Sequence, residues 1–297
     1  MIPASFEYHQ PREISEAIAL LERYGDEARI MSGGHSLIPT MKVRMSQPRH
    51  LIDIGRIGGM KGVSVEPAYL RVGAMTTHWE VESSAVVKSV LPVLSGVASL
   101  IADPMVRNRG TMGGSICNAD PAADYPASVL AFEANLVCAG RDGDRIVKGL
   151  DWFQGLFTTG LGENEILREI RFPLPKPRTA AAYLKYPHPA SRFAVVGVLA
   201  ILTVDDKGQC TDVRIGITGA GMYAVRGTLA EQKLLGRVPN PALIEEASTL
   251  APETLEINDD FHFSAADRRD LTIVHTRRAL TAALDRSRGG NFLAEAG

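Results

Sequence analysis

The sequence predicts a mixed α+β fold in two units. Segments with helical spacing and segments with strand character alternate along the 297 residues, but they form no regular strand-helix-strand repeat, which argues against a doubly wound parallel sheet. A proline-rich segment, "FPLPKPRT" at 172–179, divides the chain, because Pro173, Pro175 and Pro177 enforce an extended backbone that neither a helix nor a central strand tolerates. We therefore expect a domain boundary at about residue 177.

The first unit begins with an amphipathic helix between Pro11 and Gly25, where apolar residues recur at helical spacing: Ile14, Ala17, Ile18 and Leu21. A short strand, "ARIM", then enters one diglycine turn and a short helix, "LIPTMKVRM", leaves it. Further strands are predicted at "HLIDI", "YLRVGAM", "NLVCAG" and "EILREIRF". Helices are predicted at "YPASVLAFEA" and at "SSAVVKSVLPVLSGVASLI", with a break at Pro92.

The second unit changes composition, since strands come first and helices follow. Strands are predicted at "AAYLKY", "FAVVGVLAILTV" and "VRIGITG". Three helical segments come next: "AVRGTLAEQKLLG", "PALIEEASTLA" and residues 267–286. The last helix places Ile273, Leu280, Ala283 and Leu284 on one face, which we interpret as core packing.

The composition excludes several classes of protein. Acidic and basic residues nearly balance, 34 against 32, and no basic tract appears, which argues against nucleic acid as the main partner. The longest apolar run, Phe193 to Val204, is shorter than the ~20 residues of a membrane helix. No signal peptide is apparent, and three widely spaced cysteines favour a reduced, cytoplasmic protein without its own iron-sulfur cluster.

Three familiar motifs are rejected. "GAGMYA" at 219–224 has the spacing of a dinucleotide fingerprint, but a helix rather than a second parallel strand is predicted next. Ser36 lacks the closing glycine of a hydrolase elbow, because position 38 is Ile. The seven histidines show no ligand spacing, so no metal site is predicted. We also identify no catalytic acid or base.

Two diglycine segments remain, "SGGHS" at 32–36 and "GTMGGS" at 110–115. Adjacent residues without Cβ atoms allow positive φ and can turn backbone N–H groups toward one point, and a following helix adds its positive dipole end. Hydroxyl donors flank both segments: Ser32, Ser36, Thr111 and Ser115. We therefore expect the two turns to hold a pyrophosphate from two sides.

Two aspartates follow the second segment. Asp120 and Asp124 suit sugar or ribityl hydroxyls, which donate hydrogen bonds to carboxylates. The alternative is that Asp124 is only a helix cap before "YPAS". Because two glycine segments and the carboxylates occur together, we favour a dinucleotide-like cofactor.

The residues resemble a known family. "SGGHSLIPTMKVR" and "RGTMGGSICNADPAAD" are similar to the two flavin-binding signatures of the FAD-carrying medium subunits of molybdenum hydroxylases, above all those of aerobic carbon monoxide dehydrogenase. The resemblance covers nearly the whole chain. It implies an FAD domain of the p-cresol methylhydroxylase type at 1–177, with α+β lobes at about 1–55 and 56–177, and a smaller domain of antiparallel strands and helices at 178–297.

The resemblance also assigns FAD contacts. Residues near the pyrophosphate are Ser32, Gly33, Gly34, His35, Ser36, Leu37, Thr111, Gly113, Gly114 and Ser115, whereas Ile101, Ala102 and Leu167 are apolar contacts. Asp124 would bind FAD hydroxyls, and Lys185 would lie near the pyrimidine side of the flavin. Phe193 would lie beside the isoalloxazine; the alternative is a core residue at the start of a strand. The chain departs from the family at Met112 and at Ser115, where an asparagine is common, and its "HPASR" loop lacks an acidic residue.

The implied function is electron transfer within a larger hydroxylase. A small subunit with two [2Fe-2S] clusters would supply electrons, a large subunit would hold the molybdenum cofactor, and an external acceptor would receive the electrons, in a dimer of heterotrimers. Carbon monoxide is the favoured substrate of the complex; aldehydes and N-heterocycles such as nicotine, purines or quinolines are alternatives. A stand-alone flavin oxidase or reductase and a cofactor-free scaffold are the other hypotheses. The location would be cytoplasmic, with peripheral attachment to the inner face of the membrane through the complex as an alternative.

Overall fold

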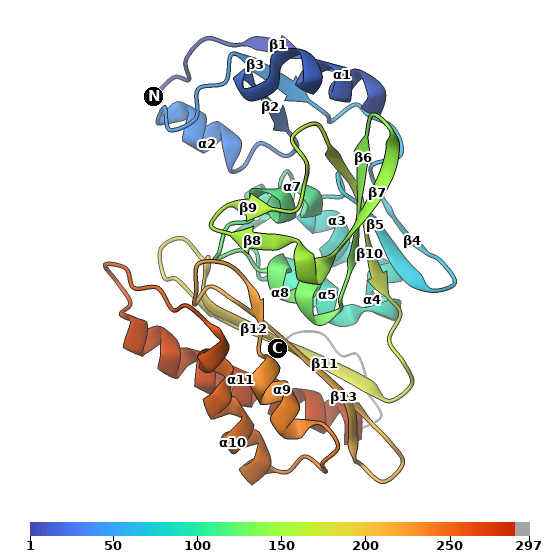
Figure 1. The fold of residues 1–297 in the computed structure, drawn as a ribbon, viewed down its shortest axis with the longest axis vertical. Helices are drawn as coiled ribbons and strands as arrows, with labels where there is room; N and C mark the ends of the chain where they lie inside the picture. The colour runs from blue at the N-terminus through green and yellow to red at the C-terminus, as the bar shows by residue number, and fades with distance from the viewer. Residues whose placement is uncertain (289–297) are drawn as a thin grey trace.

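Three tiers of sheet and helix are stacked along the longest axis of the molecule (Figure 1). The structure is a computed structural model, and it describes residues 1–288. The predicted second unit runs to residue 297, so its segment 289–297 lies outside the described residues. The mixed α+β class predicted from the sequence is confirmed.

The first tier is a small parallel sheet with the strand order β1-β3-β2. Its strands are β1 (Glu7–His9), β2 (Ala28–Met31) and β3 (His50–Asp53). Helix α1 (Ile14–Tyr24) packs on β2 and β3 and buries Ala17, Ile18 and Leu21, as its periodicity predicts. The short helix α2 (Leu37–Lys42) leaves the first diglycine segment and ends earlier than predicted.

The second tier is built on an antiparallel sheet with the order β4-β5-β10-β6-β7. The bounds are β4 (Val63–Val65), β5 (Tyr69–Gly73), β6 (Asn135–Gly140), β7 (Gly143–Lys148) and β10 (Ile166–Pro173). A small hairpin is formed by β8 (Phe153–Gly155) and β9 (Thr158–Thr159). Strands β5, β6 and β10 match the predictions, whereas the exposed edge strand β7 carries too few apolar residues to be recognised.

Short helices surround this sheet: α3 (His78–Ser83), α4 (Ala85–Val90), α5 (Pro92–Ser99), α6 (Pro104–Arg107), α7 (Met112–Asn118) and α8 (Tyr125–Ala131). The predicted break at Pro92 is confirmed, because α4 ends before it and Pro92 starts α5. Every residue of α8 is buried, so this helix lies inside the molecule.

The third tier is an antiparallel sheet with the order β11-β12-β13-β14. Its elements are β11 (Thr179–Pro187), β12 (Ala194–Val204), β13 (Cys210–Thr218), β14 (Val225–Arg226), α9 (Thr228–Leu234), α10 (Pro241–Leu250) and α11 (Ala265–Arg288). The prediction of helix at 224–226 is wrong, because Val225 and Arg226 pair with β13. Of the predicted face of α11, Leu280, Ala283 and Leu284 are buried in the core, as expected, whereas Ile273 is only partly buried.

Both faces of the third sheet are covered. Helices of the third tier and one face of the sheet form one hydrophobic cluster, while Ala181, Tyr183 and Leu199 belong to the cluster of the second tier. Helix α8 packs against β12 and β13. Because both faces of the sheet are covered, β12 is buried along nearly its whole length, and its sequence is a continuous apolar run. Among the described residues, no helix is long and apolar enough to cross a membrane.

The contact of α8 with β13 predicts a sensitive position at Gly216. A Cβ at this residue would lie 2.9 Å from the carbonyl carbon of Ala127 and nearer still to its oxygen. Gly216→Ala should therefore lower the free energy of unfolding by about 1–3 kcal/mol, the usual range for overpacking. The change is measured by denaturant unfolding of the full chain. Gly58→Ala is the matched control, since a Cβ at Gly58 meets nothing within 4 Å; equal effects of the two substitutions would contradict the prediction.

Candidate functional site

The first glycine segment, residues 32–37, connects β2 to α2 and offers unused backbone donors. Gly34 adopts φ +75°, a conformation that glycine takes without steric cost. The N–H groups of residues 33–37 form no hydrogen bond with any other described residue. The ring of His35 makes a hydrogen bond within the turn, because its Nδ1 lies 3.0 Å from the carbonyl oxygen of Gly33. Consecutive free N–H groups at the start of a helix are suited to bind a phosphate.

The second glycine segment has a different structure from the one predicted. Gly113 and Gly114 lie in the first turn of α7, after the N-cap residue Thr111, and neither has a positive φ. Their N–H groups are occupied, because Gly113 donates to the carbonyl of Ala74 (2.9 Å) and Gly114 donates to Thr111 Oγ1 (3.0 Å). A Cβ at Gly113 would collide with Ala74. The expectation that this segment forms a second turn with N–H groups available for phosphate is therefore wrong. The two glycines instead allow α7 to pack closely against its neighbours.

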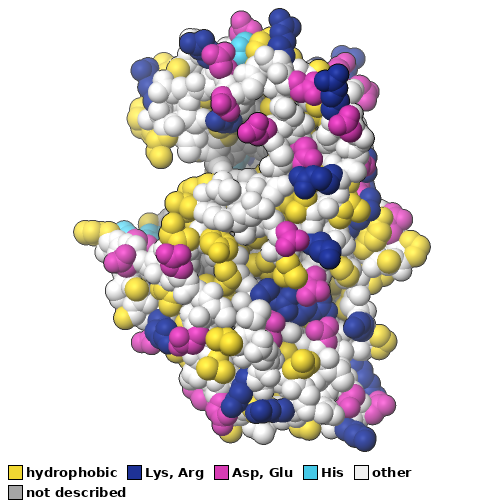
Figure 2. Space-filling view, in the orientation of Figure 1, with side chains coloured by type: hydrophobic (Ala, Val, Ile, Leu, Met, Phe, Trp, Pro, Cys, Tyr) yellow, Lys and Arg dark blue, Asp and Glu magenta, His cyan; other side chains and the backbone are white. Residues whose placement is uncertain are grey.

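The two segments touch through their backbones. A Cβ at Gly33 would lie 2.9 Å from both the carbonyl carbon of Arg109 and the Cα of Gly110. The Oγ of Ser32 and the Oγ1 of Thr111 are 2.6 Å apart, within hydrogen-bond distance. Figure 2 shows a recess between the first and second tiers, on the side where α2 and α7 face each other in Figure 1. The structure thus brings together the two segments that the sequence paired.

The loop at residues 100–102 is held by three cations, two of which the sequence analysis missed. Lys185 Nζ donates to the carbonyl of Leu100 (3.0 Å). Arg107 Nη1 donates to the carbonyl of Ile101 (3.0 Å), and Arg192 Nη1 donates to that of Ala102 (3.2 Å). Ala102 has φ +43°, which is uncommon for a residue with a Cβ. Such strain persists only where the surroundings fix the backbone, and it occurs often at functional sites.

Asp124 is the centre of a buried junction between the second and third tiers. It is 4% exposed; one carboxylate oxygen accepts from Tyr183 Oη (2.6 Å) and the other from Lys185 Nζ (2.9 Å). Tyr183 and Lys185 are two positions apart on β11, so both point to the same face of the sheet. Burial raises the pKa of Asp124 above its ordinary value, while Lys185 and the hydrogen bond from Tyr183 oppose that rise.

This junction changes the predicted roles. The alternative that Asp124 is a helix cap is wrong, because its side chain makes no capping hydrogen bond to α8. Lys185 is not an isolated cation, since its ammonium is paired with a buried carboxylate. Asp120 is more open: one of its oxygens accepts from the N–H of Ala122 (2.9 Å), and the residue is partly exposed. Burial still raises the pKa of Asp120.

The remaining predicted contacts are spread over all three tiers. Leu167 is buried in β10, beside an irregularity in its pairing with β6. Phe193 precedes β12 and is 46% exposed, so the alternative that it is a core residue is wrong. Ser36 is exposed and Ser115 is partly exposed, and neither hydroxyl bonds to another described residue. The missed residues Tyr183, Arg107 and Arg192 have no motif of their own; only the alternation of β11 could have pointed to Tyr183.

Comparison with known proteins places this geometry in a family. Residues 4–175 match the family described as FAD binding domain in molybdopterin dehydrogenase, and residues 181–283 match the CO dehydrogenase flavoprotein C-terminal domain. The carbon monoxide dehydrogenase medium chain of Hydrogenophaga pseudoflava is 38% identical over 283 residues, which is 95% of this chain and 98% of that one. The caffeine dehydrogenase subunit beta of a Pseudomonas species is 32% identical, and the alignment covers 96% of this chain and 97% of that subunit.

A solved structure agrees with these sequence relationships. The carbon monoxide dehydrogenase of Hydrogenophaga pseudoflava superposes with a TM-score of 0.93 at 39% identity, covering 96% of this chain and 99% of that chain. The match therefore extends over all three tiers rather than the glycine segments alone. The chain belongs to the family of FAD-binding medium subunits of molybdenum hydroxylases, as the resemblance of its glycine segments predicts.

Proposed function

We propose that this chain is the electron-transfer subunit of an aerobic carbon monoxide dehydrogenase, receiving electrons from [2Fe-2S] clusters of a partner subunit and delivering them to an external acceptor. The single observation that carries the proposal is the run of N–H groups at 33–37, which form no hydrogen bond with any other described residue and directly precede α2, a helix that borders the recess of Figure 2. This run is a phosphate-binding feature in a chain that matches FAD-binding relatives over nearly its whole length.

The residues present fit FAD. The N–H groups of 33–37 would hold the pyrophosphate, and the free hydroxyls of Ser36 and Ser115 would add donors. The partly open carboxylate of Asp120 suits a ribityl or ribose hydroxyl better than Asp124, both of whose oxygens already accept hydrogen bonds. Bound FAD supplies one- and two-electron chemistry, and the protein contributes binding, orientation and electrostatics.

Within this chain, the buried pair of Lys185 and Asp124 would provide the electrostatic tuning of the flavin. Lys185 and Asp124 together carry no net charge, so their field comes from the orientation of the pair rather than from a free cation. The hydrogen bond from Lys185 Nζ to the carbonyl of Leu100 connects this ion pair to the strained loop at 100–102. We place that loop, with Ile101 and Ala102, and the exposed ring of Phe193 beside the flavin, as the resemblance implies.

The substrate assignment depends on relatives, since this chain would not contain the molybdenum site. Carbon monoxide is proposed from the relative that is 38% identical; the caffeine dehydrogenase relative supports an N-heterocycle as the alternative. The test is to co-express the tagged full chain with its neighbouring subunits, isolate the complex, measure iron and molybdenum, and assay carbon monoxide, aldehydes and N-heterocycles. We expect iron, molybdenum and flavin in one complex that oxidises carbon monoxide. A chain that purifies alone and turns over a substrate by itself would contradict the subunit proposal.

Gly33→Ala should weaken FAD binding. The added Cβ would collide with the backbone at Arg109 and Gly110, so the two glycine segments must move apart. Because the phosphate donors lie on one segment and must stay aligned with the rest of the recess, we expect a loss of affinity of at least about tenfold, equivalent to about 1.4 kcal/mol. The affinity is measured by flavin fluorescence titration of the apoprotein. Gly58→Ala is the control, and apoprotein melting curves distinguish weakened binding from unfolding; unchanged affinity in a folded Gly33→Ala variant would refute the role.

Lys185→Met should lower the flavin reduction potential. Removal of the ammonium leaves the buried Asp124 carboxylate uncompensated, which disfavours negative charge on reduced flavin. We expect a drop of about 30 mV, which corresponds to about 1.4 kcal/mol for two electrons, and a loss of stability of about 3 kcal/mol, as for other broken buried pairs. The double variant Lys185→Met/Asp124→Asn removes both charges and should recover stability and part of the potential. The reduction potentials are measured by spectroelectrochemical titration. A Lys185→Met variant that folds and has an unchanged flavin potential would show that Lys185 does not tune the flavin.

A further inference from the structure

A second set of ligand-type side chains lies in the first tier: Glu7, His9 and His50. In the parallel pairing of β1 with β3, Glu7 is directly opposite His50. Glu7 and His9 are two positions apart on β1, so alternation along the strand places all three side chains on the same face of the sheet. The sequence analysis missed this cluster, because His9 and His50 are 41 positions apart and only the pairing of β1 with β3 joins them.

The three side chains converge on one point. His9 Nε2 is 3.1 Å from His50 Nδ1, Glu7 Oε2 is 3.4 Å from His50 Nδ1, and Glu7 Oε2 is 3.9 Å from His9 Nε2. Ligands bound to Zn²⁺ at about 2.0–2.1 Å in a tetrahedron are roughly 3.3 Å from each other. The separations of 3.1 and 3.4 Å lie close to this value, and the third, between Glu7 Oε2 and His9 Nε2, is longer at 3.9 Å.

The surroundings hold the imidazoles in place. The ring of Tyr24 stacks on His50, with centroids 3.6 Å apart and an angle of 12° between the planes. Arg23 in turn lies over the Tyr24 ring at 5.1 Å. The His9 and His50 side chains are 20% and 12% exposed, whereas Glu7 is 72% exposed, so the cluster is sheltered on the imidazole side and open to solvent on the carboxylate side.

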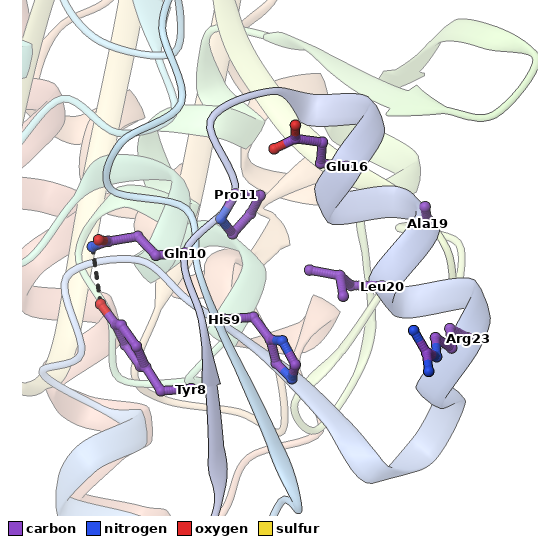
Figure 3. A pocket seen from close by; sticks show the side chains of 8 residues that line it. All are labelled: Tyr8, His9, Gln10, Pro11, Glu16, Ala19, Leu20 and Arg23. Atoms are coloured by element: carbon purple, nitrogen blue, oxygen red, sulfur yellow. Dashed lines mark hydrogen bonds between the residues drawn. The ribbon is translucent and has the colours of Figure 1, made fainter.

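Figure 3 shows the hollow beside this cluster. It has a volume of about 590 Å³, lies between β1 and α1, and has His9 on its wall together with Leu20 and Arg23. The His9 side chain points toward α1 in this view. The hollow thus adjoins the imidazole of His9, while solvent reaches the cluster directly at the Glu7 carboxylate, which is 72% exposed.

We propose that Glu7, His9 and His50 form a Zn²⁺ site with three protein ligands and a water in the fourth position. Two imidazole nitrogens and one carboxylate oxygen are a ligand set that Zn²⁺ accepts in this geometry. Without a cation, the two facing imidazole nitrogens share a single hydrogen bond and the carboxylate approaches at longer distance. The bound cation would join β1, a three-residue edge strand, to β3.

This site is separate from the cofactor recess. His50 is the first residue of β3 and is level with Ala28 at the start of β2, whereas the phosphate-binding segment follows the other end of β2. Zinc binding and FAD binding can therefore be tested independently on the same protein.

The experiment uses the FAD-loaded full chain, purified without a histidine tag, stripped with a chelator and titrated with Zn²⁺ by calorimetry. We expect one equivalent to bind and to raise the thermal unfolding midpoint. Glu7→Ala, His9→Ala and His50→Ala should each lower the zinc affinity by at least about tenfold, since loss of a direct ligand costs no less than loss of a supporting residue. His262→Ala replaces an exposed histidine of the third tier and should bind as the unchanged protein does.

Two results would overturn the site: absence of saturable binding, or equal zinc affinity in Glu7→Ala and the unchanged protein. Retained FAD content shows that each variant is folded. Should His50→Ala unfold because the stacking with Tyr24 is lost, Glu7→Ala decides the question, because the Glu7 side chain is largely exposed and its carboxylate lies near the two histidines of the cluster rather than in the core.

Discussion

The contact between Gly33 and the backbone at Arg109 and Gly110 is the constraint on which the rest of the site depends. It joins the first tier to the second so closely that only glycine fits at position 33, because a Cβ there would lie 2.9 Å from backbone carbons of both Arg109 and Gly110. Because the contact is between backbones, the positions of β2, α2 and α7 are fixed relative to each other without long side chains that would have to be ordered. The recess of Figure 2 is therefore a consequence of how the two tiers meet, and the residues that line it follow from this contact.

The two diglycine segments look alike in the sequence but serve different physical purposes. At Gly34 the absence of a Cβ permits positive φ, and the N–H groups of residues 33–37 have no hydrogen-bond acceptor within the described part of the chain. At Gly113 it permits a helix to approach Ala74, and the N–H groups are used inside the protein. It follows that, in the proposed FAD site, the amide donors would come from the first segment only, while the second segment would add the Ser115 hydroxyl and the dipole of the helix that begins there.

Much of the fold could be predicted from local patterns, and the failures share a cause. The faces of α1 and α11, the break at Pro92 and the buried strand β12 follow from periodicity and proline geometry, which act within a few residues. The pairing of the glycine segments could be predicted because both carry adjacent glycines flanked by hydroxyl side chains, although only the first segment forms the predicted turn. The Tyr183-Asp124-Lys185 junction and the Glu7-His9-His50 cluster could not, since each depends on which strands become neighbours, and β1 is too short to show any period.

The buried pair of Lys185 and Asp124 also limits how the proposed flavin tuning could work. A lone buried ammonium would carry a large desolvation cost, whereas Lys185 is compensated by Asp124, and Asp124 is held in turn by Tyr183. The field of such a pair falls off faster with distance than that of a single charge, so its effect must be local and directional. Because Lys185 also donates a hydrogen bond to the carbonyl of Leu100, the pair is linked to the loop at 100–102. In the proposed function, Lys185 would therefore couple flavin tuning to the geometry of this loop, while the carbonyl of Ala102 accepts hydrogen bonds from Arg192 (3.2 Å) and Arg107 (3.4 Å).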